Sequence, residues 1–438
     1  MAVPLRVLAV GSVYPPHHLG GYEIIWRGAM RHVREQGHLA RILTTGYRRP
    51  EAGPDAVEDP DVHRELDWYW RDHEWRSLGP RERYRLERGN ARVFDRHLRE
   101  FRPDVIAWWP VGGMSLGLIE RARRAGIPSL FFVLDPWLSY GPEHDLWNHM
   151  WARLGPVATL ADRLTGLPTR VDYAHAGRWV FCSETMRRQT LAAGLATAAT
   201  AGTASTTVIT PGVEADYLSA PADPDPDPDP EPEPEPEPPL WRWRLLYIGP
   251  GVEQKGVATA IESLALLPAA ATLRILGEGD AGYRRRLEAL AERLHVTAQV
   301  SFEAPRPREE LKAAYREADA VVFPVEWPEP WGLVPLEAMA LGRPVVATGR
   351  GGSGEYLVDQ GNALLHAPGS PTELAAALRT LAGDPALRER LRRGGHETAA
   401  RHSEDAFNRQ ALAELQAAAR RGPEAPRTAA APRRRRGA

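Results

Sequence analysis

The feature that most constrains the fold of this chain is a run of alternating acidic residues and prolines at residues 223–238. Proline at every second position excludes a helix and a central strand, because proline lacks a backbone N–H and has a fixed φ angle. The eight carboxylates of the run repel one another, which favours an extended chain. We therefore predict a disordered linker over residues 221–240, which divides the 438-residue chain into two folded parts.

The first part, residues 1–220, alternates apolar runs with amphipathic segments. Near-continuous apolar runs are typical of parallel strands that are buried on both faces. We expect strands at residues 5–11, 39–44, 104–109 and 129–134, and helices at residues 23–36, 81–100 and 115–125. Residues 46–80 and 138–176 show no clear period, and we expect insertions there.

The second part, residues 241–403, repeats the alternation more regularly. Strands are predicted at residues 244–249, 272–276, 299–302, 320–324, 344–347 and 363–365, with helices between them. Repeated strand–helix units build a parallel sheet that helices cover on both faces. The predicted fold class is therefore α/β, with two Rossmann-like, doubly wound parallel-sheet domains. A helix at residues 404–421 is expected to pack back onto the first domain, and the basic tail, residues 422–438, is expected to be disordered.

Composition excludes several classes of protein. The formal net charge of −2 argues against a general binder of nucleic acid or of membrane surfaces. Cys182 is the only cysteine, so we expect no disulfide framework and no thiolate metal cage, which fits a cytoplasmic protein. No apolar run reaches the roughly 20 residues that a membrane-spanning helix needs. The apolar residues 3–11 lack a basic leader and are predicted to form the first strand.

Residues 329–337 are the segment that most strongly indicates chemistry. The carboxylates of Glu329 and Glu337 flank Gly332, and a predicted helix begins between them. A loop that enters a helix presents free backbone N–H groups and the positive end of the helix dipole, which together bind anions. Carboxylates beside such a site can accept hydrogen bonds from sugar hydroxyls. The segment therefore suits a nucleotide-sugar, whose phosphate and sugar it could hold together.

The spacing of these carboxylates resembles the E-x7-E signature of the retaining family-4 glycosyltransferases, which have the GT-B fold. Further segments resemble the same family: residues 247–249, 254–256, 276–279, 342–348 and 351–355 in the second part, and residues 8–11, 20–23, 181–184 and 208–213 in the first. The resemblance covers most of residues 5–400. It implies two domains that face a cleft, with the acceptor bound by the first domain and the nucleotide-sugar by the second.

The resemblance implies roles for residues around the signature. Glu337 would bond the ribose hydroxyls, and Glu329 would bond the transferred sugar. Gly332 and Leu333 would offer backbone N–H groups to the phosphates or to the sugar. The alternative is that Glu329 and Glu337 are two surface carboxylates around a turn.

Lys255 is the residue expected to contact the diphosphate. The chain has only two lysines, Lys255 and Lys312, among 55 basic residues. A lysine between a strand and a helix therefore suggests a site that needs a compact point charge. Lys312 lies in an amphipathic segment and is expected to be solvated. Gly249 and Gly277, at the ends of the first two strands of this domain, are expected to line the nucleotide site.

In the first domain, Gly20 and Gly21 lie between the first strand and the first helix. Residues without side chains let the backbone approach a diphosphate from across the cleft, although an ordinary flexible turn would have the same composition. Asp135 follows the strand at residues 129–134 and is the best candidate for a carboxylate on the acceptor side. A structural cap is an equally good interpretation of Asp135.

The chain departs from the family pattern at two positions. Pro250 stands where the family usually has an arginine after the strand glycine, so another arginine or backbone donors would have to replace that charge. Leu134 stands where the family often has a histidine, which leaves the imidazole on the acceptor side unassigned.

The predicted function is transfer of a sugar from a UDP- or GDP-linked donor to a small polar acceptor with retention of configuration, without a metal or other cofactor. Bacterial secondary-metabolite or sugar-conjugate biosynthesis is the expected setting. The two departures keep open a non-catalytic nucleotide-sugar-binding protein. An NAD-dependent Rossmann enzyme is a third interpretation, because Gly277, Gly279 and Gly282, followed by Glu303, mimic a dinucleotide fingerprint. That fingerprint follows the second strand of its domain, whereas the motif belongs after the first.

Overall fold

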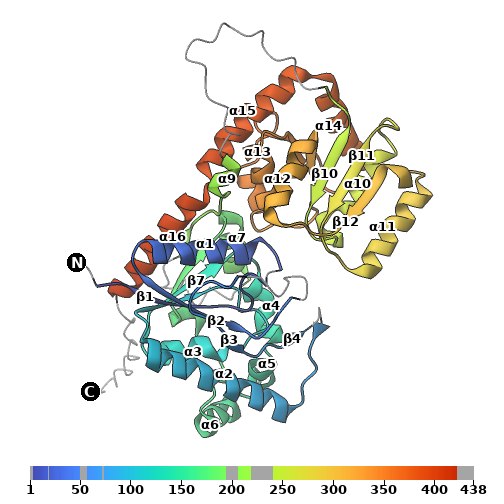
Figure 1. Ribbon diagram of the computed structural model, residues 1–438. Coiled ribbons are helices and arrows are strands. Elements are labelled where there is room, and N and C mark those ends of the chain that lie inside the picture. The colour runs from blue at the N-terminus through green and yellow to red at the C-terminus, as the bar shows by residue number, and fades with distance from the viewer. Residues whose placement is uncertain are drawn as a thin grey trace, which may run out of the picture.

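The computed structural model describes residues 3–17, 19–49, 57–71, 74–193, 206–218 and 240–421. These residues form two α/β domains and a small antiparallel pair of strands, β4 (Trp70–Arg71) and β5 (Glu74–Trp75) (Figure 1). Apart from residue 240, the predicted linker lies outside the described residues, as does the predicted tail. Among the helices that are described, none is both long and apolar enough to cross a membrane.

The first domain is built on a seven-stranded parallel sheet with the order β3-β2-β1-β6-β7-β8-β9. Its strands are β1 (Arg6–Val10), β2 (Leu39–Thr45), β3 (Val62–Leu66), β6 (Val105–Trp108), β7 (Ser129–Val133), β8 (Arg178–Phe181) and β9 (Thr206–Val208). The order reverses direction between β1 and β6. Open α/β sheets bind ligands at such a switch point, beyond the carboxyl ends of the strands.

Helices cover both faces of this sheet. They are α1 (Gly21–Glu35), α2 (Pro80–Phe101), α3 (Gly117–Arg124), α4 (Trp137–His144), α5 (Leu146–Trp151), α6 (Gly155–Thr165) and α7 (Glu184–Ala192). The short helix α9 (Ala215–Leu218) instead contacts α13 (Leu333–Ala340) and α15 (Pro385–Arg401) of the second domain. Figure 1 shows α1 on one side of the sheet and α2 and α3 on the other. Two segments, residues 46–80 and 138–176, show no hydrophobic period in the sequence. They contain the short elements β3, β4, β5, α4, α5 and α6, most of which are too short to produce a recognisable period.

Aromatic side chains fill the core on both faces of the first sheet. Neighbouring strand residues point to opposite faces, so Trp108 packs on Phe131 while Trp109 packs on Phe132. The ring centroids of these pairs lie 5.9 Å and 4.2 Å apart. Trp109 also stacks on Trp26 of α1 at 5.8 Å. The tryptophans at these positions are therefore part of the core.

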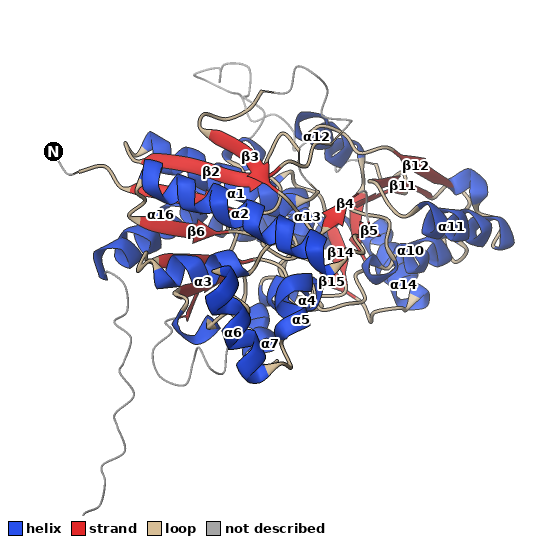
Figure 2. Ribbon diagram, turned by 90° about the horizontal axis from the view of Figure 1, so that it is seen from below, coloured by secondary structure: helices blue, strands red, loops and turns tan. Residues whose placement is uncertain are grey.

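The second domain is built on a six-stranded parallel sheet with the order β12-β11-β10-β13-β14-β15. Its strands are β10 (Arg244–Ile248), β11 (Thr272–Leu276), β12 (Val300–Glu303), β13 (Ala320–Phe323), β14 (Val345–Ala347) and β15 (Leu364–Leu365). Its helices are α10 (Val257–Leu264), α11 (Ala281–Arg293), α12 (Arg308–Glu317), α13 (Leu333–Ala340), α14 (Pro371–Gly383) and α15 (Pro385–Arg401). Figure 2 shows helices around both sheets. Both doubly wound sheets confirm the predicted fold class.

The last described helix, α16 (Glu404–Arg421), returns to the first domain. Figure 1 shows α15 and α16 running one after the other from the second domain to the first, where α16 packs against α1, β6 and β7. Arg178 of β8 pairs with Glu414 of α16 at 2.5 Å. The side chain of Glu404 in α16 reaches Gly28 of α1, where a Cβ would lie 1.8 Å from its carboxylate oxygen.

The domains also touch at the start of α7. The hydroxyl of Ser183, which caps this helix, donates to the carbonyl of Pro330 at 2.7 Å. The carboxylate of Glu355, from the second domain, accepts the backbone N–H groups of Glu184 and Thr185 at 3.0 Å and 2.6 Å. A helix of the first domain is thus partly capped by a side chain of the second.

We expect Glu355→Ala to lower the free energy of unfolding by about 1–2 kcal/mol, because two N–H groups at a positive helix end would lose a charged acceptor. Chemical denaturation of the full chain measures this change. The control is Glu184→Ala, which removes a carboxylate that pairs with Arg187 at the surface and should cost at most about 0.5 kcal/mol. Equal stability of the two variants would contradict the capping role of Glu355.

Candidate active site

A pocket of about 480 Å³ lies between the two domains. Its lining residues follow the carboxyl ends of strands in both sheets, where ligands of α/β proteins bind. The volume is in the range of about 300–1,000 Å³ that is usual for small-molecule sites. The candidate residues that line it are Gly20, Gly21, Asp135, Gly249, Gly277, Glu329, Gly332, Leu333 and Glu337. Lys255 does not line this pocket itself but contacts a residue that does.

Lys255 and Glu329 form an ion pair at the edge of the pocket. The Nζ atom of Lys255 lies 2.6 Å from Oε2 of Glu329, and the indole N–H of Trp327 donates to the same oxygen at 2.8 Å. Lys255 ends a short 3-10 turn before α10, and the following Gly256 has a φ angle of +67°. A side chain on Gly256 would collide with the carbonyl of Pro324. The loop after β13 and the turn before α10 are therefore packed backbone to backbone, which brings Lys255 and Glu329 together.

Glu337 is buried in α13 and is held through both carboxylate oxygens. Tyr315 donates its hydroxyl to Oε2 at 2.7 Å, and Arg308 donates to Oε1 at 2.9 Å. Arg308 also bonds Glu214 of the first domain at 3.1 Å. Burial alone would lower the pKa of Arg308, but the charges of Glu337 and Glu214 raise it. Glu337 is thus a fixed carboxylate whose remaining lone pairs can accept bonds from a ligand in the pocket.

Arg308 and Tyr315 are site residues that the sequence analysis missed. They lie seven positions apart on α12, a spacing that puts both side chains on the same helix face. That spacing can be read from the sequence, but it does not predict which carboxylate this face of α12 contacts.

Two helix N-termini meet at the pocket. Gly332, with a φ angle of +88°, precedes α13, and Gly21 is the first residue of α1. A Cβ on Gly21 would lie 3.3 Å from the side chain of Leu333, so the two helix starts are neighbours across the cleft. The helix predicted from Glu23 begins at Gly21, because the Glu23 carboxylate accepts the N–H of Gly20 at 3.0 Å and caps the first turn. Two positive helix ends therefore point at one region.

Gly249 and Gly277 have a structural role as well as a place in the pocket lining. A Cβ on Gly277 would lie 2.0 Å from the carbonyl oxygen of Gly249, so the loops after β10 and β11 touch through their backbones. Gly279 similarly approaches Gly251, where a Cβ would lie 2.4 Å from the carbonyl oxygen. Close backbone contacts therefore explain two of the three glycines that mimic a dinucleotide fingerprint, Gly277 and Gly279.

Asp135 lines the pocket from the first domain and also orders its own loop. It accepts the hydroxyl of Tyr140 at 2.8 Å and the backbone N–H of Trp137 at 3.4 Å. Burial raises the pKa of Asp135 to about 6, against the hydrogen bond from Tyr140, which lowers it. Asp135 therefore orders its loop and lines the pocket, and its role on the acceptor side stays a prediction. Leu134 lines the pocket beside it.

Three arginines line the pocket that Pro250 also lines. Arg49 comes from the first domain, and Arg306 and Arg308 come from the second. Each of them faces a carboxylate: Arg49 pairs with Glu278, Arg306 with Glu303, and Arg308 with Glu337 and Glu214. Guanidinium groups are therefore present at the pocket although Pro250 carries no charge, and carboxylates pair with each of them.

Residues 232–398 match the family model described as "Glycosyl transferases group 1". The chain is 35% identical over 185 residues to a glycogen synthase from Mycobacterium tuberculosis, a match that covers 42% of this chain and 44% of that protein. It is 48% identical over 104 residues to a D-inositol 3-phosphate glycosyltransferase from Corynebacterium jeikeium, which is 24% of each chain. The chain thus spans less than half the length of these curated relatives.

Similarity in three dimensions covers nearly the whole chain. Anabaena HepE in complex with UDP and glucose has a TM-score of 0.63 at 21% identity, covering 94% of this chain and 99% of that chain. Sucrose-phosphate synthase from Thermosynechococcus elongatus has a TM-score of 0.65 at 20% identity, covering 94% and 98%. The chain therefore has the GT-B fold of glycosyltransferases, and its second domain matches the group 1 glycosyl transferase family.

Proposed function

We propose that this chain is a retaining glycosyltransferase of family 4, which moves a sugar from a UDP- or GDP-linked donor to a small polar acceptor. The observation that carries the proposal is the ion pair of Lys255 and Glu329 at 2.6 Å, at the edge of a pocket that residues of both domains and the N-terminus of α13 line. The complex of HepE with UDP and glucose supports a UDP-linked sugar. The name of the D-inositol 3-phosphate glycosyltransferase supports a small polar acceptor in a bacterial biosynthetic pathway.

The donor would be bound mainly by the second domain. The diphosphate would lie at the starts of α1 and α13, where free N–H groups and two positive dipole ends favour an anion. Glu337 would accept hydrogen bonds from the ribose hydroxyls, and Glu329 from the sugar. Lys255 and the neighbouring arginines would supply the positive charge that a metal supplies in other transferases, so the proposal includes no metal.

The reaction would break the bond between the anomeric carbon and the diphosphate oxygen. The new bond would form on the same face of the sugar, between the anomeric carbon and the acceptor oxygen, and the departing diphosphate would take the acceptor proton. Negative charge grows on the diphosphate in the transition state, so cations and N–H groups fixed beside it lower the barrier. Lys255 would exchange its contact with Glu329 for one with the phosphate.

Asp135 would act on the acceptor side, where its carboxylate can accept a hydrogen bond from the attacking hydroxyl. The ionised form accepts that bond more strongly than the protonated form, and burial raises the pKa of Asp135 to about 6. We therefore expect kcat/KM for the acceptor to fall as the pH falls through about 6. In Asp135→Asn this acid limb should be absent, and the rate at pH 8 should be about 100-fold lower. An acid limb near pH 6 in Asp135→Asn would contradict this role.

The proposed function is tested by calorimetric titration of the full chain with UDP, GDP, ADP and NAD, followed by an assay of the matching nucleotide-sugar. We expect micromolar binding of one nucleoside diphosphate and slow hydrolysis of its sugar conjugate in the absence of an acceptor. Glu329→Ala should abolish that hydrolysis. Binding without turnover would favour the non-catalytic interpretation, and binding of NAD alone would overturn the assignment.

A further inference from the structure

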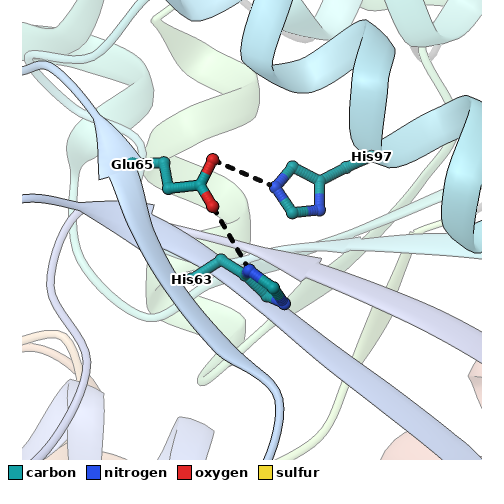
Figure 3. A group of neighbouring side chains, drawn as sticks. All are labelled: His63, Glu65 and His97. Atoms are coloured by element: carbon teal, nitrogen blue, oxygen red, sulfur yellow. Dashed lines mark hydrogen bonds and ion pairs between the residues drawn. The ribbon is translucent and has the colours of Figure 1, made fainter.

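Strand β3 and helix α2 bring three potential metal ligands together outside the pocket. His63 and Glu65 lie two positions apart on β3, so their side chains point to the same face. His97 lies on α2, which packs against β3. Figure 3 shows the carboxylate of Glu65 between the two imidazole rings. Each of the three residues offers one ligand atom, and these atoms all lie within 4.8 Å of one another. Among the described residues, no other group of three or more His, Cys, Asp or Glu meets this condition.

His97 is the reason to regard this group as more than a surface cluster. Its side chain is only 1% exposed, and neither ring nitrogen has a hydrogen-bond partner. The Nε2 atom lies 3.5 Å from Oε2 of Glu65, which is too long for a good hydrogen bond. A neutral imidazole has one ring nitrogen with a free lone pair that can bind a metal. Buried polar atoms in proteins are normally satisfied, and a metal ion would satisfy this one.

Two distances between ligand atoms, each to a different oxygen of Glu65, are close to those around a small divalent ion, and all three ligand atoms lie within 4.8 Å of one another. Nδ1 of His63 lies 3.3 Å from Oε1 of Glu65, close to the 3.5 Å between Nε2 of His97 and Oε2 of Glu65. A tetrahedral site with bonds of about 2.0–2.1 Å places its ligand atoms about 3.3–3.4 Å apart. The side chains of His63 and Glu65 are 29% and 34% exposed, which leaves them room to turn toward an ion and admits a water as a further ligand.

The residues around the three ligands support the same interpretation. Oδ1 of Asp61 lies 2.7 Å from Nε2 of His63, and Asp61 is in turn held by Arg41 at 2.9 Å. A carboxylate on the second ring nitrogen of a histidine fixes the tautomer in which the first nitrogen can bind a metal. Arg96 pairs with the Glu65 carboxylate, as outer partners of a ligating carboxylate do.

We propose that His63, Glu65 and His97 form a binding site for a divalent transition-metal ion such as Zn²⁺. Two imidazoles and one carboxylate are a ligand set that Zn²⁺ accepts, whereas Mg²⁺ and Ca²⁺ prefer sites made of oxygen atoms. The site is separate from the pocket, since none of its three residues lines it. The ion would link the edge strand β3 to α2, so its role is to stabilise the first domain.

The test is calorimetric titration of the full chain, without an affinity tag and after removal of metals by chelation, with ZnCl₂ and with MgCl₂. We expect one Zn²⁺ site that is lost in His63→Gln, with affinity at least about 100-fold lower, and little binding of Mg²⁺. Asp61→Asn should weaken the site by about 10- to 100-fold. Zn²⁺ should also raise the Tm of the wild-type chain, and this rise should be absent in His63→Gln.

The matched control is His175→Gln. His175 forms a similar pair with a carboxylate, 2.9 Å from Asp172, but belongs to no three-residue group in the described chain. Its affinity for Zn²⁺ should equal that of the wild type. His97→Gln changes a buried residue and can fail to fold, so the exposed Glu65→Gln is the second variant. Equal Zn²⁺ affinity in the wild type, His63→Gln and Glu65→Gln, or no Zn²⁺ binding by the wild type, would overturn the proposal.

Discussion

Lys255→Ala should lower kcat with the nucleotide-sugar by about 100- to 1,000-fold, which is the usual effect of removing one fixed donor to a developing negative charge. The variant loses the cation beside the diphosphate. It also leaves the Glu329 carboxylate with the indole N–H of Trp327 as its remaining partner, so its negative charge would repel the diphosphate. Charge grows on the diphosphate as the bond to the sugar breaks, so kcat should fall more than KM rises. Steady-state kinetics with saturating acceptor measures both constants.

Two further variants make this result specific. Lys312→Ala removes the only other lysine, which pairs with Asp216 and does not line the pocket, so kcat should stay within about twofold. Lys255→Arg keeps the charge but not its compact shape, so an intermediate loss is expected. A similar loss in Lys312→Ala and Lys255→Ala would mean that a general loss of positive charge, and not a contact at the diphosphate, sets the rate.

The two α/β domains could be predicted because each buried parallel strand is a short apolar run in the sequence. For example, β10 and β13 are short apolar runs that end just before Gly249 and Pro324, which mark the ends of the strands. It fails for β3, β4 and β5, which are short and carry charged or aromatic residues that give no period. The ligands of the proposed metal site on β3 were missed for this reason, since His63 and Glu65 lie in a segment without a predicted strand.

The candidate pocket could be predicted at the level of its loops. Residues that follow parallel strands gather at one edge of the sheet, and for this reason Gly249, Gly277 and Glu329 line one pocket. The roles that we assign to them stay predictions. Contacts between side chains of different elements were not predictable: Trp327 meets Glu329, and Arg308 meets Glu337. Such contacts depend on how α12 and the loops are rotated against their neighbours, which no local pattern records.

Glu337→Ala should have two effects that can be measured separately. Loss of the hydrogen bonds to the ribose should weaken nucleotide binding by about 1–3 kcal/mol, or roughly 5- to 150-fold. Loss of the carboxylate also leaves the hydroxyl of Tyr315 and one arm of Arg308 without their partner. Arg308 is 25% exposed and keeps Glu214, so we expect a cost of about 1–3 kcal/mol in the free energy of unfolding, below the 3–5 kcal/mol of a fully buried pair.

A loss of nucleotide binding counts as evidence for the ribose contact only if destabilisation alone does not cause it. Glu120→Ala is the matched control, because Glu120 is equally buried and pairs with Arg123 and Arg124 away from the pocket. It should destabilise the chain to a similar degree and bind the nucleotide with the affinity of the wild type. Tyr315→Phe should weaken binding by at most about 1 kcal/mol, since it removes a bond that orients Glu337 and leaves the carboxylate in place. Nucleotide affinity that is unchanged in Glu337→Ala would remove this residue from the donor site, and with it the strongest reason to interpret the two carboxylates as one nucleotide-sugar signature.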